Sequence, residues 1–119
     1  MIAGGHVTLA VADLGRAIRF YVEVLGMKLV ATDARTGSID AGDGLTIVLL
    51  SGRQKTAPKF ALGTAMPDSL LGLRVKSELK DVVAVLENRG IDFVLQDAGP
   101  HMRAHFRDPD ENDLYLFHG

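Results

Sequence analysis

The sequence predicts an α+β fold made of two successive β-α-β-β-β modules. Two segments of the 119-residue chain each show a strand pattern, then a helix pattern ending at glycine, then three further strand candidates. Equivalent residues lie 64 positions apart, as do Leu9 and Leu73 or Gly26 and Gly90. A fixed period of this kind indicates repeated structural units. We therefore expect one domain with three parts: module one (5–51), a connector (52–68) and module two (69–119).

Module one opens with an alternating strand and an amphipathic helix. Over residues 6–12, Val7, Leu9 and Val11 share one face, which places His6 and Thr8 on the other. Asp13 is a suitable helix N-cap, and Gly26 a suitable end. The apolar residues between them recur at helical spacing: Leu14, Ala17, Ile18, Tyr21, Val22 and Leu25.

Three strand candidates and a connector complete the first half. The strands are expected at about 27–32, about 37–41 and 45–50, and Asp43-Gly44 predicts a tight turn between the last two. Residues 51–68 mix glycines and prolines with polar residues, which is typical of a surface connector.

The second half repeats this order. Leu71, Leu73 and Val75 form an apolar strand face, and Ser77 is a plausible N-cap for the helix that follows. The helical stripe consists of Leu79, Val82, Val83 and Leu86, and Gly90 ends it. Further strands are expected at about 91–96, 102–107 and 113–117, with a turn over 108–112.

Composition excludes several classes of protein. The chain has no cysteine, which removes disulfides and thiolate metal sites and favours the cytoplasm. No apolar run reaches the ~20 residues of a membrane helix, and the first residues do not resemble a signal peptide. The formal net charge of -2 and the absence of tryptophan provide no basic surface for nucleic acid. We therefore expect neither nucleic acid nor membrane as a partner.

Several motifs resemble the vicinal oxygen chelate superfamily. They are the run from His6 to Leu14, the pairs Phe20-Tyr21 and Leu25-Gly26, and the late turn Phe106-Arg107-Asp108-Pro109-Asp110-Glu111-Asn112. That superfamily includes glyoxalase I, extradiol dioxygenases, fosfomycin-resistance enzymes and bleomycin-resistance proteins. The resemblance implies a glyoxalase-like fold, in which the strands form a cup-shaped mixed sheet around a small molecule and the helices lie outside. It also implies a homodimer.

The same resemblance places metal ligands on the first and last strands of each module. His6 matches the first of these positions, whereas its counterpart 64 residues later is Leu70. The last-strand position falls at Ile47 or Val48 in module one and at Tyr115 in module two. Protein sites for zinc, nickel or non-haem iron need three or more His or carboxylate donors. We therefore expect no metal and predict no cofactor.

Candidate ligand-binding residues lie on strand faces that would line the implied cup. His6 can serve as a base, a hydrogen-bond donor or a ligand, or it can be an ordinary hydrogen-bonded histidine. Tyr115 can donate a hydrogen bond, stack on a flat ligand or simply fill space. Arg103 and His105 share a face and would meet an anionic or hydroxylated ligand, unless that face is a solvated edge. The full set is His6, Thr8, Leu70, Gly72, Arg74, Arg103, His105, Tyr115 and Phe117.

The function predicted from these features is metal-independent sequestration of an aromatic or amphiphilic compound in an apolar cup. Two enzymatic alternatives remain open. One is a metal-dependent lyase, isomerase or dioxygenase, in which a degenerate site near His6 and His105 holds Zn, Ni, Mn or Fe. The other is a metal-free acid-base enzyme with His6 and Tyr115 as catalytic residues. A third possibility is an interaction domain with an empty cup.

Overall fold

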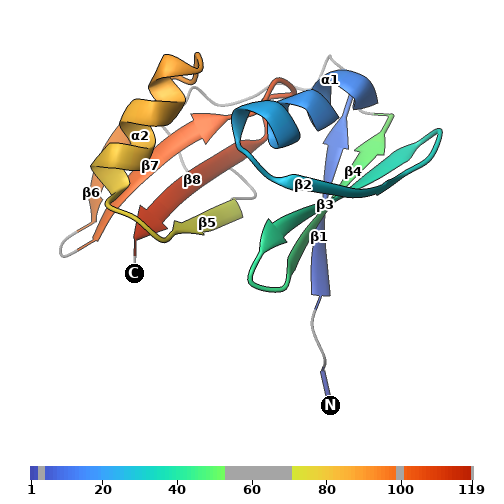
Figure 1. The fold of residues 1–119 in the computed structure, drawn as a ribbon, viewed down its shortest axis with the longest axis horizontal. Helices are drawn as coiled ribbons and strands as arrows, with labels where there is room; N and C mark the ends of the chain where they lie inside the picture. The colour runs from blue at the N-terminus through green and yellow to red at the C-terminus, as the bar shows by residue number, and fades with distance from the viewer. Residues whose placement is uncertain (3–4, 53–70, 99–100, 119) are drawn as a thin grey trace. The chain divides into compact units, whose positions relative to one another are not determined.

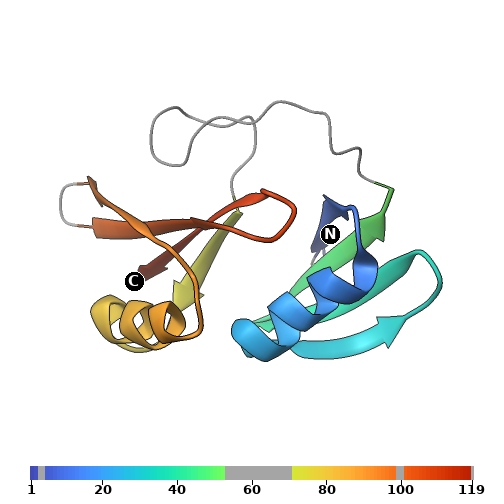
Figure 2. The same cartoon turned by 90° about the horizontal axis from the view of Figure 1, so that it is seen from above.

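The computed structural model describes residues 1–2, 5–52, 71–98 and 101–118. The chain divides into two compact units, Met1–Ala57 and Pro58–Gly119, and each contains a four-stranded mixed sheet and a helix (Figures 1 and 2). The predicted α+β class with two β-α-β-β-β modules is thereby confirmed. Most of the expected connector lies outside the described residues, so its boundaries stay a prediction.

Unit 1 contains the first β-α-β-β-β module, with a π-helical turn after its helix. Its elements are β1 (Gly5–Val11), α1 (Leu14–Arg19), the π-helical turn η1 (Phe20–Val24), β2 (Lys28–Thr32), β3 (Thr36–Gly42) and β4 (Leu45–Ser51). The strand order is β1-β4-β3-β2. β1 runs parallel to β4, and the remaining neighbours are antiparallel. The first strand of the module therefore pairs with its last.

The core of unit 1 lies between this sheet and its helix. Alternate strand residues are fully buried together with two helix residues: Val11, Ala17, Tyr21, Ile39, Ile47 and Leu49. Gly37 allows close approach of the helix, because a Cβ there would lie 3.0 Å from Cδ1 of Ile18. The predicted inward face of the first strand is thus confirmed at Val11, and His6 and Thr8 are exposed.

The helix of unit 1 differs from the expected regular one. Asp13 is its N-cap, as predicted, and accepts a hydrogen bond from the Arg16 N–H at 3.0 Å. After Arg19, however, the helix widens into η1, where the Leu25 N–H donates to the Phe20 carbonyl five residues earlier. A π turn accommodates one more residue than an α turn. It leaves Tyr21 fully buried.

Unit 2 repeats the arrangement. Its elements are β5 (Leu71–Val75), α2 (Leu79–Asn88), β6 (Val94–Ala98), β7 (His101–Arg107) and β8 (Asp113–His118). The strand order is β5-β8-β7-β6, with β5 parallel to β8. The core combines one face of the sheet with the apolar side of α2: Leu73, Leu79, Val83, Leu86, Ala104, Phe106, Leu114 and Leu116. Neither helix in the described parts of the chain is long and apolar enough to cross a membrane.

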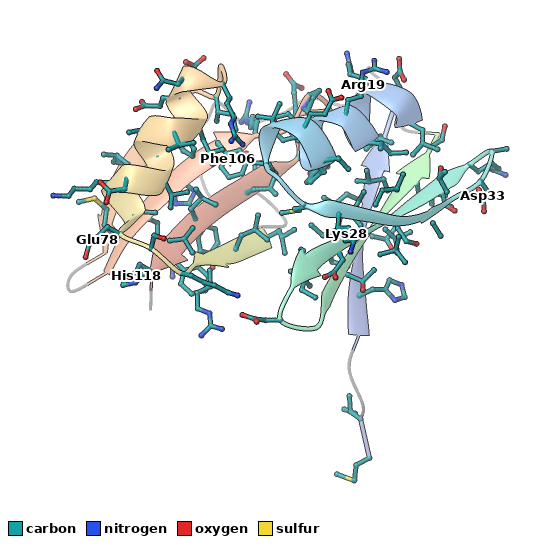
Figure 3. The ribbon with its side chains drawn as sticks, in the orientation of Figure 1. Arg19, Lys28, Asp33, Glu78, Phe106 and His118 are labelled. Carbon is teal, nitrogen blue, oxygen red and sulfur yellow. The ribbon has the colours of Figure 1, made fainter. Side chains whose placement is uncertain are left out.

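Two expected boundaries in unit 2 are corrected. Ser77 is not the N-cap, because the cap position belongs to Glu78 (Figure 3), whose carbonyl accepts the Val82 N–H at 3.2 Å. The next strand begins at Val94 rather than near Ile91. The Ile91 N–H instead donates to the Leu86 carbonyl at the end of α2, and Ile91 is buried there.

Both predicted hairpin turns are present. Asp43 and Gly44 have φ values of 50° and 82°, as a two-residue type I′ turn requires. In the 108–112 turn, the buried carboxylate of Asp108 accepts the N–H groups of Asp110 and Asn112 at 2.9 and 2.8 Å, and the Asn112 side-chain amide at 2.8 Å. Glu111 adopts φ 64°, a left-handed conformation that favours glycine. Local hydrogen bonds thus hold a turn that contains a strained residue.

Candidate functional site

Six of the predicted site residues lie on one face of the sheet of unit 2. Buried and half-buried residues alternate along β7 and β8, and the half-buried ones turn away from the core. Strand register arranges this face in two rows across the four strands. The first row is Gly72, Tyr115, His105 and Val94, and the second is Arg74, Phe117, Arg103 and Gln96.

Tyr115 occupies the middle of this face, and its ring lies across Gly72. A Cβ added to Gly72 would lie 2.5 Å from Cζ and 2.6 Å from Oη of the ring, far inside contact distance. The glycine therefore makes room for the tyrosine. The Tyr115 ring centroid lies 5.4 Å from that of His105 and 5.9 Å from that of Phe117. Three adjacent rings thus form a continuous aromatic surface, which we call the Tyr115 face.

Arg103 places a positive charge over this surface. Its guanidinium carbon lies 4.8 Å from the centre of the Tyr115 ring, within the range of a cation–π interaction. Among the described residues, no hydrogen bond or ion pair engages its N–H groups. A guanidinium has five N–H donors in a planar fork. Arg103 therefore stacks on Tyr115 and retains donors for another group.

His105 contributes a neutral ring to the same face. Burial lowers its pKa below the ordinary value of 6.5, the nearby Arg103 charge lowers it further, and Asp113 opposes both effects. Its Nε2 is buried and has no hydrogen-bond partner within the described residues. At neutral pH the imidazole is therefore uncharged.

One end of the Tyr115 face is closed by an ion pair. Nε of Arg107 lies 3.0 Å from Oδ1 of Asp113, and their side chains are 20% and 11% exposed. These two residues pair across β7 and β8 in the row that precedes Tyr115. The carboxylate of Asp113 is thus neutralised by Arg107.

The remaining predicted residues lie elsewhere or are not described. His6 and Thr8 are exposed on the corresponding face of unit 1, where His6 pairs with Thr46 and Thr8 with Val48. Leu70 lies outside the described residues. Gln96 was missed by the sequence analysis, although alternation along its strand places it beside Arg103. Alternation together with the hairpin register is the signal that would have found it.

Register also shows how the two units differ. The pairs Thr8–Val48 and Gly72–Tyr115 occupy equivalent places, since each joins the first and last strands of its sheet. In unit 1, Val48 is next to Ser38, where unit 2 has His105 beside Tyr115. The following row of unit 1 is Ala10, Leu50 and Thr36, in place of Arg74, Phe117 and Arg103. The aromatic and cationic character is therefore particular to unit 2.

Comparison with known proteins identifies the family. The model of the Glyoxalase/Bleomycin resistance protein/Dioxygenase superfamily matches residues 4–116. The chain belongs to this superfamily. No match was found among curated protein sequences.

Several solved structures are similar to this chain over nearly its whole length. An integron cassette protein from the mobile metagenome of V. cholerae is 25% identical, with a TM-score of 0.72 over 99% of this chain and 95% of that one. A virulence protein from Salmonella typhimurium is 26% identical, with a TM-score of 0.71 over 99% and 98% of the two chains. A fosfomycin resistance protein from Listeria monocytogenes is 18% identical and shares the fold, with a TM-score of 0.76 over 100% and 95%.

The residues at the superfamily's metal positions do not form a suitable donor set. The register selects Val48 over Ile47, because Ile47 is fully buried in the core and Val48 pairs with Thr8. The four positions are thus His6, Val48, Leu70 and Tyr115, with one imidazole and no carboxylate among them. Within the residues that the structure describes, no three His, Asp or Glu side chains come together in a way that could hold an ion. These residues do not fit a metal site of three or more His and carboxylate ligands.

Proposed function

We propose that this superfamily member binds an aromatic or amphiphilic small molecule on the Tyr115 face, without a metal ion, and so sequesters it. The observation that carries the proposal is the placement of Tyr115. At the position where metal-dependent members carry an acidic ligand, this chain has a phenol ring, which lies across Gly72 and contacts Arg103, His105 and Phe117.

The surface is suited to a flat apolar ligand. Tyr115 and Phe117 are half-buried, so their rings retain area that a ligand can cover. Burying apolar area contributes about 25 cal/mol per Å², and each well-oriented aromatic pair adds about 0.5–1.5 kcal/mol. The close approach of Gly72 and the stacked Arg103 guanidinium restrain the Tyr115 ring before binding. A restrained surface loses little side-chain entropy when the ligand arrives.

The residues at the four superfamily metal positions support a function that needs no metal ion. His6 is the one imidazole at a superfamily metal position, and the other three positions carry two aliphatic side chains and a phenol. Lewis-acid catalysis of the superfamily's kind needs an ion held by several ligands. Binding on an aromatic surface needs no metal ion. The residues that form this surface all lie on the sheet of unit 2.

The experiment is a fluorescence titration with N-phenyl-naphthylamine, a neutral aromatic probe that brightens in apolar sites. The chain has no tryptophan, so the protein background is low. We expect saturable binding that is unchanged by a chelator and is weakened at least tenfold in Tyr115→Ala. The control is Leu95→Ala, which removes an apolar side chain, 57% exposed, from the opposite face of the same sheet.

Metal analysis completes the test. After incubation with Zn, Ni, Mn and Fe(II) and removal of excess ion, we expect no stoichiometric metal. Binding that survives in Tyr115→Ala would overturn the proposed surface. A stoichiometric ion that is lost in His6→Ala would overturn the metal-independent function and favour the metalloenzyme alternative.

A further inference from the structure

We propose that the Tyr115 face selects aromatic compounds that carry a negative charge, with the aromatic ring against the rings of Tyr115 and Phe117 and the anionic group on Arg103. This inference rests on the proposed function and names the class of its ligand. A carboxylate, sulfonate or phosphonate attached to an aromatic ring has the required chemistry.

Three of the four strands place titratable groups on the face. β5 contributes Arg74, β7 contributes Arg103, His105 and Arg107, and β8 contributes Asp113, whereas Val94 and Gln96 of β6 carry no charge. Asp113 is paired with Arg107 at 3.0 Å, and His105 is held neutral by its burial. The guanidinium of Arg103 therefore remains a positive charge without an acidic partner among the described residues.

Arg103 lies where it can bind the anionic group. Its guanidinium stacks on the ring that the ligand is proposed to contact, and its N–H donors engage no hydrogen bond or ion pair among the described residues. A cation beside an aromatic surface binds an anion in a less hydrated setting than bulk water, which strengthens the interaction. A planar guanidinium can also hold a carboxylate through two parallel hydrogen bonds.

The two rows of the face differ in charge. Tyr115 and His105 form an uncharged row, and Arg74, Phe117 and Arg103 form the charged one. Adjacent rows lie two residues apart along each strand, a distance of about 7 Å. Because the Arg103 guanidinium reaches back over Tyr115, an aromatic body against the neighbouring rings and an anionic group on Arg103 fit within one small molecule.

Unit 1 provides an internal comparison. At the places equivalent to Arg74, Phe117 and Arg103, unit 1 has Ala10, Leu50 and Thr36, and its sheet has the same strand order. The fold therefore does not require cations there. Their presence in unit 2 is explained by recognition of an anion rather than by the architecture.

The test compares two probes that differ in a single group. Anilinonaphthalene sulfonate is the sulfonated counterpart of N-phenyl-naphthylamine, so their affinity ratio reports the contribution of the anion. Hydrogen bonds to charged groups are strong enough to predict a ratio of roughly tenfold or more. Added salt should weaken binding of the sulfonate and leave that of the neutral probe unchanged.

Variants assign the effect to Arg103. Arg103→Met keeps an apolar stem but loses the charge, so we expect the ratio to fall to about one, chiefly through weaker sulfonate binding. Arg103→Lys should retain part of the preference. Arg19→Met, which removes the same group from α1 in unit 1, should change neither affinity. Urea unfolding of each variant checks that the fold is intact.

The outcomes separate the two proposals. If neither probe binds in a manner that depends on Tyr115, the proposed function is wrong. If the neutral probe binds through Tyr115 but the sulfonate is not preferred, only the anionic ligand class is wrong. If Arg103→Met weakens both probes equally, Arg103 supports the ring and does not select charge, which also overturns the inference.

Discussion

Substitution of Gly72 by alanine tests the geometry of the Tyr115 face directly. The new Cβ would lie 2.5 Å from Cζ of Tyr115, whereas carbon atoms in contact lie about 3.5–4.0 Å apart. The ring must therefore move by about 1 Å or rotate off the strand. Gly72 does not have a left-handed φ, so alanine is compatible with its backbone.

The size of the effect follows from two opposing terms. An added methyl group in a packed place costs about 1–3 kcal/mol, and the lower half of that range applies because the clash is with the end of a rotatable side chain. Replacing a strand glycine by alanine stabilises by about 0.5–1 kcal/mol. Gly72→Ala alone should therefore destabilise only slightly. In a Tyr115→Ala background, it should stabilise by about 0.5–1 kcal/mol.

The assay is a double-mutant cycle measured by urea unfolding. The expected coupling between Gly72 and Tyr115 is about 1–2 kcal/mol, well above the ~0.5 kcal/mol within which independent sites add. Gly5→Ala in β1 is the control, because no atom lies within 4 Å of its Cβ position. Additive effects of Gly72→Ala and Tyr115→Ala would refute the placement of the ring. Gly72→Ala should also weaken binding of the neutral probe.

Four further predictions concern stability. Asp108→Ala should lower the free energy of unfolding by about 3 kcal/mol in urea, because three donors lose a buried acceptor. Glu111→Gly should raise it by about 1 kcal/mol, since φ 64° disfavours a side chain; an unchanged or lower value would contradict this. The hydrogen bond from the Arg16 backbone N–H lowers the pKa of Asp13 below 3.8, so the stabilisation by the Asp13 carboxylate is present above that pH and is lost in acid. In Asp13→Ala, the midpoint of thermal unfolding should therefore fall less steeply as the pH is lowered through that range. Burial lowers the pKa of His105 below 6.5, so the unfolded chain takes up the proton first and stability falls as pH decreases through that value. His105→Gln should reduce the difference between urea midpoints measured at about pH 7.5 and pH 5.5.

The fold was predictable where local chemistry and the repeat agree. Asp13 caps its helix as predicted, and Asp43-Gly44 forms the expected two-residue turn. The π turn at Phe20–Val24 was not predicted, because over so few residues an apolar pattern cannot distinguish its period from that of an α-helix. Ser77 was wrong as an N-cap because helix ends depend on which carbonyl accepts the first hydrogen bond, and that carbonyl belongs to Glu78.

The candidate site was predictable as a face but not as a set of contacts. Alternation alone placed Tyr115, His105 and Arg103 on one side of their strands. The stacking of Arg103 on Tyr115 depends on the register between β7 and β8, which pairs Arg103 with Phe117 rather than with Tyr115. The function of Gly72 emerges only when β5 is paired with β8. The Arg103–Tyr115 stacking and the role of Gly72 both depend on how strands pair, which the pattern within a single strand does not reveal.

The parallel pairing of first and last strands has a consequence for how each unit folds. Gly5 pairs with Leu45, and Leu71 with Leu114, so about 40 residues must be ordered or looped before either pair can close. Closing a loop of that length costs about 3 kcal/mol of chain entropy, whereas the hairpins between neighbouring strands close over a few residues. The three later strands of each unit are therefore expected to assemble first. The opening strand, which in unit 1 carries His6, would be secured last, so its docking would limit the rate of folding.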